Sequence, residues 1–76
     1  MDIETLLARK EMRQAIRHAI ENLPDTHRDV LLLRYVEELD TEETAGILRS
    51  SCGAVKVRSH RARAALKKLI ESGVEP

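Results

Sequence analysis

The sequence predicts an all-α domain built from four helices. Its 76 residues leave room for one small domain. Good helix formers such as Leu, Ala, Glu and Arg dominate the composition, and Tyr35 is the one aromatic residue. So few aromatic side chains argue against a β-sandwich, a barrel or a base-stacking RNA platform. Apolar residues recur at helical spacing in four segments, which assigns the fold class.

The first two predicted helices meet at Pro24. An apolar stripe predicts a helix over about residues 2–22, and the stripe thins between Leu7 and Ala15. We therefore expect the front of this helix to fray or to belong to a linker. The fixed φ of Pro24 suits the opening turn of a second helix, over about residues 25–38. That helix is apolar around much of its surface, so it is expected at the centre of the bundle.

The third predicted helix, about residues 41–49, begins with a capping box. The Asp40 carboxylate is expected to accept the backbone N–H of Glu43, whose side chain reaches back to the Asp40 N–H. The expected buried side is narrow and consists of Thr44, Ala45, Ile47 and Leu48. Ser51 is the expected N-cap of the next helix. The domain itself is predicted over residues 23–72, behind an N-terminal helix (1–22) and before a tail (73–76).

The fourth predicted helix, about residues 52–72, has two contrasting faces. At about 100° per residue, the face predicted to be buried holds Val55, Ser59, Ala62, Leu66, Leu69 and Ile70. The opposite face holds Val57, His60, Arg61, Ala64 and Lys68, with Lys56 and Lys67 on one flank and Arg58 and Arg63 at the shoulders. The chain has no net charge, yet no acidic residue lies between Arg49 and Lys68. This positive segment favours contact with nucleic-acid phosphates over an ordinary solvated face, which would mix both signs.

The spacing of one small residue and one apolar residue indicates a helix-turn-helix. Such a motif needs a small residue midway along its first helix and an apolar anchor early in its second helix, with a tight turn between. Ala45 and Val55, ten residues apart, meet both needs. The basic helix that follows would then be the one that enters the major groove of DNA.

Several short motifs resemble region 4 of extracytoplasmic-function sigma factors, over about residues 20–70. They are Leu23-Pro24, Arg28-Asp29-Val30, Leu32-Leu33-Arg34, Glu42-Glu43-Thr44-Ala45, Ile47-Leu48, Gly53-Ala54-Val55-Lys56 and His60-Arg61-Ala62-Arg63. The resemblance implies recognition of the minus-35 promoter element and docking on the β flap of RNA polymerase. It also implies capture by an anti-sigma factor. Region 2 of such factors has no counterpart here, so we expect a fragment of a sigma factor rather than a stand-alone relative.

The chain departs from the family pattern at six positions, which are Thr44, Arg49, Ser50, Cys52, Ala54 and Ser59. Arg49 replaces a Gly that usually ends the third helix, and Thr44, Ser50 and Ser59 replace apolar residues. These four changes weaken the core and predict modest stability. The basic helix stays intact.

The candidate site residues fall into two groups. Lys56, Val57, His60 and Arg61 lie near the start of the basic helix and are expected to read base edges, as the family resemblance also implies. The residues expected at phosphates are Arg49, Ser51, Arg58, Arg63 and Lys67. For Arg58 and Arg63, pairing with acids of neighbouring helices is an equal alternative.

Other classes of function find little support in the sequence. Cys52 is the only cysteine and the three histidines have no metal-ligand spacing, so neither a disulfide, a metal nor another cofactor is expected. Capping explains Glu42 and Glu43, so we expect no enzyme. The chain has neither a signal-peptide pattern nor a run of the roughly 18 apolar residues that a membrane span needs, so a cytoplasmic location is expected. A monomer is expected because no apolar stripe is left over for self-association once the four helices have packed. Two alternatives stay open, a LuxR-type output domain and a protein-interaction module.

Overall fold

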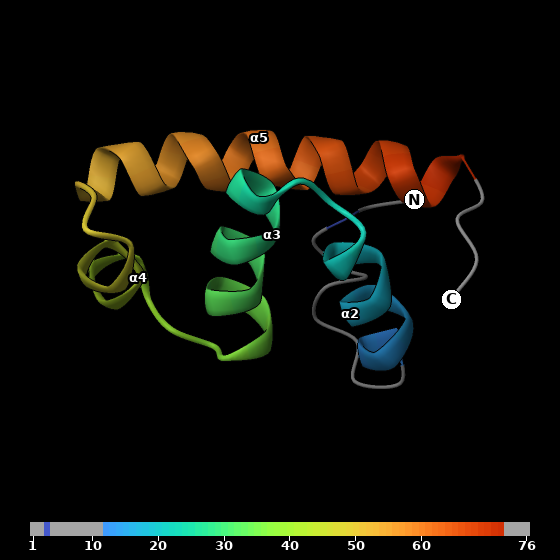
Figure 1. Ribbon diagram of the computed structural model, residues 1–76, viewed down its shortest axis with the longest axis horizontal. Coiled ribbons are helices and arrows are strands. Elements are labelled where there is room, and N and C mark those ends of the chain that lie inside the picture. The colour runs from blue at the N-terminus through green and yellow to red at the C-terminus, as the bar shows by residue number, and fades with distance from the viewer. Residues whose placement is uncertain (1–2, 4–11, 73–76) are drawn as a thin grey trace.

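The computed structural model describes residue 3 and residues 12–72. The described residues form helices and turns and contain no strand, which confirms the all-α prediction. The helical elements are α2 (Arg13–Glu21), α3 (Asp25–Leu31), the π-helical turn η2 (Leu32–Val36), α4 (Thr41–Leu48) and α5 (Cys52–Glu71). The long helix α5 runs across one side of the molecule, and α2, α3 and α4 pack beneath it (Figure 1). The front of the first predicted helix and the predicted tail lie outside the described residues.

Pro24 opens α3 as predicted. It is the N-cap residue, with φ −57° and ψ 153°, and its carbonyl accepts the backbone N–H groups of His27 and Arg28 at 2.9 Å each. An ion pair of 3.1 Å joins Arg28 to Asp25 in the first turn of the helix. The rigid extended backbone at Pro24 therefore separates α2 from α3 and lets the two helices pack side by side.

The second predicted helix does not remain α-helical to its end. After Leu31 the backbone widens into η2, and the chain then turns at Glu38, whose φ is 58°. The Glu37 N–H donates to the Leu32 carbonyl at 2.8 Å, a bond that spans five residues instead of four. The predicted helix over about residues 25–38 is therefore present as far as Val36, but its last part is a π-helical turn that the sequence did not predict. The run from Val30 to Leu33 is apolar on every side, so its periodicity does not show where an extra residue enters a turn.

Helix α4 begins with the predicted capping box. The Glu43 N–H donates to Asp40 Oδ1 at 2.7 Å, and the Asp40 N–H donates to Glu43 Oε1 at 3.0 Å. The helix ends at Leu48, one residue before the predicted end, because Arg49 adopts a left-handed conformation with φ 54°. The Ser50 N–H then bonds to the Ala45 carbonyl at 2.9 Å, which closes the helix end. Arg49 thus performs the role for which glycine is best suited.

Ile47 was predicted to be buried on α4, and this prediction was wrong. Its side chain is 58% exposed, whereas Thr44 and Ala45 are buried and Leu48 is half-buried. The helix has only eight residues and packs on α5 and η2 through one narrow side. Ile47 lies on the flank of that side, so no described neighbour covers it.

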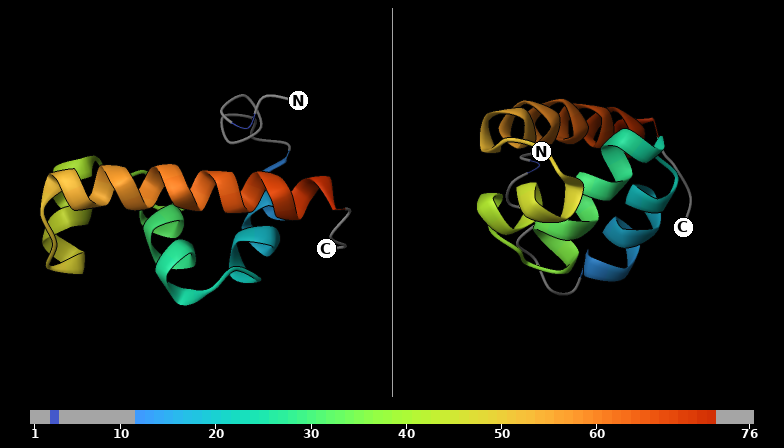
Figure 2. Two further views of the ribbon diagram at one scale, coloured as in Figure 1. Left: turned by 90° about the horizontal axis from the view of Figure 1, so that it is seen from above. Right: turned by 60° about the vertical axis from the view of Figure 1, so that its left-hand side comes forward.

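The core lies where α3 meets α5. Val55, Ala62 and Leu66 of α5 are completely buried, as are Val30 and Leu31 of α3. The predicted inward face of α5 is confirmed, with Ser59 also buried and Leu69 and Ile70 half-buried. Figure 2 shows α5 crossing over the shorter helices from two further directions. The predicted central position of the second helix is confirmed, since α3 contacts α2, η2 and α5.

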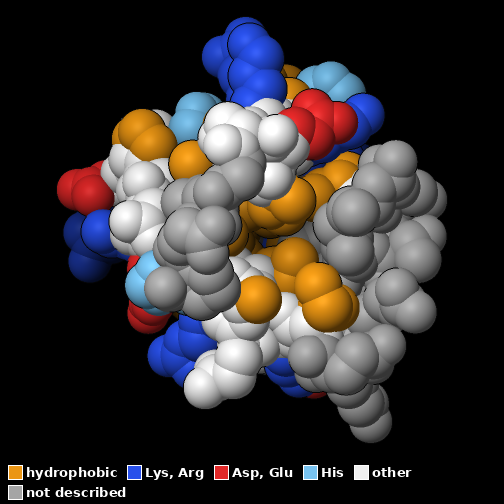
Figure 3. Space-filling model, turned by 90° about the vertical axis from the view of Figure 1, so that its right-hand side faces the viewer, with side chains coloured by type: hydrophobic (Ala, Val, Ile, Leu, Met, Phe, Trp, Pro, Cys, Tyr) orange, Lys and Arg blue, Asp and Glu red, His pale blue; other side chains and the backbone are white. Residues whose placement is uncertain are grey.

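Two further features of the packing are a hydrophobic area at one end of the molecule and two buried hydroxyl groups in its middle. At the end of the molecule where α2 lies beside the C-terminal part of α5, hydrophobic side chains gather at the surface (Figure 3). In the middle of the fold, two buried hydroxyl groups, Thr44 Oγ1 and Ser59 Oγ, lack a hydrogen-bond partner in the structure. Such groups weaken a core, because they lose water without gaining a new partner.

Candidate nucleic-acid interface

The candidate interface is the outward face of α5. Because Val55 is completely buried, it fixes the rotation of the helix, and Lys56 and Val57 consequently face solvent. Ser51 caps the helix by accepting the Ala54 N–H at 3.1 Å, so the first turn is held in place. With 20 residues, α5 is about 30 Å long. It therefore presents a straight, rigid edge long enough to enter a groove of duplex DNA.

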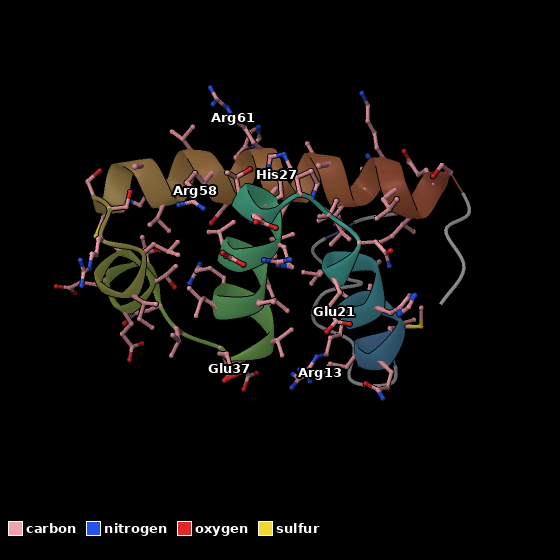
Figure 4. The ribbon with its side chains drawn as sticks, viewed as in Figure 1. Arg13, Glu21, His27, Glu37, Arg58 and Arg61 are labelled. Atoms are coloured by element: carbon pink, nitrogen blue, oxygen red, sulfur yellow. The ribbon has the colours of Figure 1, made fainter. Side chains whose placement is uncertain are left out.

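The structure brings the four predicted base-reading residues together. Lys56, Val57, His60 and Arg61 are all exposed and occupy adjacent positions on the first half of α5. Arg61 extends away from the bundle (Figure 4). Val57 is 48% exposed, an apolar side chain within a cationic surface. This combination of cations, an imidazole and one apolar group has the chemistry needed to read base edges.

The residues predicted at phosphates lie in two kinds of surroundings. Arg49, Ser51 and Lys67 are exposed, the first two at the turn between α4 and α5 and Lys67 two turns beyond the base-reading residues. Arg58 and Arg63 are half-buried at the shoulders of α5. These two guanidinium groups also make contacts within the fold.

Arg58 and Arg63 connect α5 to the central helix. Arg58 Nη2 donates to the Thr26 carbonyl at 3.0 Å, and its side chain lies along α5 on the side of α3 (Figure 4). Arg63 Nη1 donates to the Tyr35 hydroxyl at 3.0 Å. The sequence suggested acids as the intramolecular alternative to phosphates; the described acceptor of Arg58 is instead a carbonyl, and Tyr35 is one of the partners of Arg63. No sequence signal identifies Thr26, because any residue supplies a backbone carbonyl.

The arginines of α2 and α3 are paired with acids, whereas in the described part of the chain the cations on the outward face of α5 are not. Three arginines on α2 and α3 form ion pairs with acidic side chains: Arg17 with Glu21, Arg28 with Asp25 and Asp29, and Arg13 with Glu38. On the outward face of α5, by contrast, Lys56, Arg61, Lys67 and Lys68 have no ion-pair partner among the described residues. Within residues 12–72, that face is therefore positively charged without ion pairs to neutralise it, despite the zero net charge of the chain.

Other kinds of site find no support in residues 12–72. Within the described part of the chain, no group of three or more His, Cys, Asp or Glu residues is arranged to hold a metal ion. Nor is any described helix both long and apolar enough to cross a membrane. Cys52 is exposed and not in a disulfide.

A capped helix-turn-helix whose second helix exposes cations that no described acid pairs with is typical of a DNA-binding domain. Comparison with known proteins gives the family: the model described as "Sigma-70, region 4" matches residues 13–66. The chain therefore belongs to the sigma-70 region 4 family. This assignment decides against the LuxR-type alternative.

Among curated proteins, the similar ones are RNA polymerase sigma factors. The chain is 43% identical over 58 residues to the ECF RNA polymerase sigma factor SigW of Bacillus subtilis, covering 76% of this chain and 31% of that protein. It is 42% identical over 65 residues to the sigma factor YlaC of the same organism (86% of this chain, 38% of that protein). It is 35% identical over 68 residues to the ECF sigma-E factor of Escherichia coli K12 (90% and 36%).

The chain thus spans about a third of the length of these relatives. No solved structure gives a significant match.

Proposed function

We propose that this chain recognises the minus-35 promoter element, as region 4 of an extracytoplasmic-function sigma factor that directs transcription initiation. One observation carries the proposal. The outward face of α5 holds four exposed residues of base-reading chemistry, Lys56, Val57, His60 and Arg61, and its cations are not neutralised by described acids. The names of the relatives support the sigma-factor role.

The first half of α5 would lie in the major groove. Lys56 and Arg61 have the donors for guanine O6 and N7, and Val57 has the methyl groups that suit a thymine methyl. His60, which lies between them on the surface, can donate or accept a hydrogen bond. The capped N-terminus of α5 directs backbone N–H groups outward at the same end of the helix.

Phosphate contacts would flank this region and fix the orientation of α5. Arg49 and Ser51 lie at the turn, and Lys67 lies further along the helix. Arg58 and Arg63 also belong to the proposed phosphate set. Each guanidinium carries five N–H donors, so the bond from Arg58 to Thr26 leaves others that a phosphate could accept.

The proposed partners follow from the family. In the cytoplasm, the β flap of core RNA polymerase would hold this domain near the promoter, and an anti-sigma factor would block it. A single helix in one groove buries little surface. We therefore expect the isolated chain to bind its duplex no more tightly than about 1 µM, and we also expect it to be monomeric. Nanomolar binding in an anisotropy titration at about 0.15 M salt would contradict this expectation.

The decisive experiment selects preferred sequences from a library of randomised duplexes. The wild-type chain should enrich one short motif, and a Lys56→Ala/Arg61→Ala variant should lose that enrichment. Arg17→Ala is the matched control, because Arg17 is exposed on α2, away from the interface. If the wild-type chain enriches no motif, or if the control loses enrichment equally, α5 does not read DNA sequence.

A further inference from the structure

Helix α4 has an outward side that no other described element covers. It consists of Glu42, Glu43, Gly46 and Ile47, all exposed, and we refer to it as the α4 outer face. These positions are adjacent on a helix, two in one turn and two in the next. Ile47 is 58% exposed, and the only other exposed large hydrophobic residue among those described is Val57. The base-reading surface accounts for Val57, whereas the proposed function leaves Ile47 without a role.

Gly46 is also unexplained by the fold. It lies inside α4, its backbone is not in the left-handed region, and a Cβ built on it would meet nothing within 4 Å. Neither a turn nor a close neighbour within the chain requires glycine there, and glycine is a poor helix former. A glycine at such a position lets another molecule approach the helix backbone closely. It therefore leaves a shallow surface beside the protruding Ile47.

The charge around this surface identifies the kind of molecule that fits. Residues 37–48 contain five acidic residues and neither Lys nor Arg. Glu42 is exposed and has no ion-pair partner among the described residues, while Glu43 uses one carboxylate oxygen in the capping box. Phosphates are repelled by such a surface, and cations are attracted.

We propose that the α4 outer face is a docking surface for a protein segment in which Lys or Arg residues flank a large apolar side chain. The apolar side chain packs on Ile47 over Gly46, and the cations lie against Glu42 and Glu43. Helix α4 packs beneath the first part of α5, whereas Arg61 extends from the other side of α5 (Figure 4). This segment can therefore dock while the outward face of α5 is on DNA. The proposal goes beyond the DNA contact and does not depend on it.

The test uses a defined probe, a helical peptide with Leu on one side and Lys on both flanks, and its counterpart with Glu in place of Lys. Added to the isotope-labelled chain, the Lys peptide should give saturable amide shifts at the α4 outer face, and the Glu peptide should not. Ile47→Ser should weaken binding at least fivefold. Gly46→Gln should also weaken it at least fivefold while raising the melting temperature, because glutamine favours a helix. Val57→Ser is the matched control and should bind like the wild-type chain.

Four results would overturn the proposal. If the Ile47→Ser variant binds the Lys peptide as tightly as the wild-type chain does, the peptide is held only by general electrostatic attraction. Shifts confined to Glu37 and Glu38 would place the peptide elsewhere. If the amide shifts of the α4 outer face change with the concentration of the chain and without peptide, the face binds a second copy of the chain. Shifts there on adding duplex DNA would make it part of the DNA interface.

Discussion

Replacing Thr44 by valine should stabilise the fold. The Thr44 side chain is completely buried, and its hydroxyl has no hydrogen-bond partner in the structure. Valine has nearly the same shape, so the change exchanges the hydroxyl for a methyl group with little repacking. An unpaired buried hydroxyl costs roughly 1–3 kcal/mol in mutational data. We therefore expect Thr44→Val to raise the free energy of unfolding by about 1–2 kcal/mol. For a domain of this size that is roughly 4–16 °C in melting temperature.

Thermal unfolding followed by circular dichroism at pH 7 measures the effect, and Thr26→Val is the matched control. Thr26 is exposed on α3 and contributes its backbone carbonyl, not its side chain, to the bond with Arg58. The control should change stability by less than about 0.5 kcal/mol. An unchanged or lower melting temperature for Thr44→Val would show that the hydroxyl is satisfied, for instance by a buried water. A double variant with Ser59→Ala then tests whether both hydroxyls share one water, since their effects would not add.

Three further predictions concern the helix-turn-helix. Arg61→Ala should weaken binding to the preferred duplex by roughly 1–3 kcal/mol and relax selection at one base pair, as competition titrations would show. An equal loss on random DNA would mean that Arg61 holds a phosphate. With about four to six phosphate contacts, log K should fall against log salt with a slope of about −4 to −5, and a flat dependence would refute the role of α5. Ala45→Leu should destabilise the fold by about 1–3 kcal/mol, because Ala45 is buried between α4 and α5. An unchanged melting temperature would place the helix crossing elsewhere.

The sequence predicted best those features whose causes are local. The capping box of α4 depends on Asp40 and Glu43, three residues apart, and the cap of α5 depends on Ser51. Both formed as predicted. The rotation of α5 was predictable for a similar reason. Its apolar positions leave one consistent inward face, and the outward face with Arg61 follows from it.

The features that the sequence did not predict depend on distant or ambiguous partners. The π-helical turn (Leu32–Val36) begins within the apolar run from Val30 to Leu33, where one inserted residue changes no pattern. Exposure of Ile47 depends on which side of a short helix its neighbours cover. The contact between Arg58 and Thr26 joins positions 32 residues apart and uses a carbonyl that any residue would supply. The amino-acid sequence contains no pattern that predicts any of these three features.

The separation of charge has a consequence for how such a domain discriminates between DNA sequences. A chain of zero net charge exerts little attraction on DNA at distances beyond the Debye length, about 8 Å at physiological salt. Among residues 12–72, acids engage Arg13, Arg17 and Arg28, whereas Lys56, Arg61, Lys67 and Lys68 on the outward face of α5 have no ion-pair partner. Binding to random DNA arises almost entirely from such phosphate contacts. A domain that can make only a few of them binds random DNA weakly, so contacts to base edges form a larger share of its total binding energy. Such a domain would gain selectivity at the expense of affinity, which agrees with the proposal that a larger assembly brings it to the promoter.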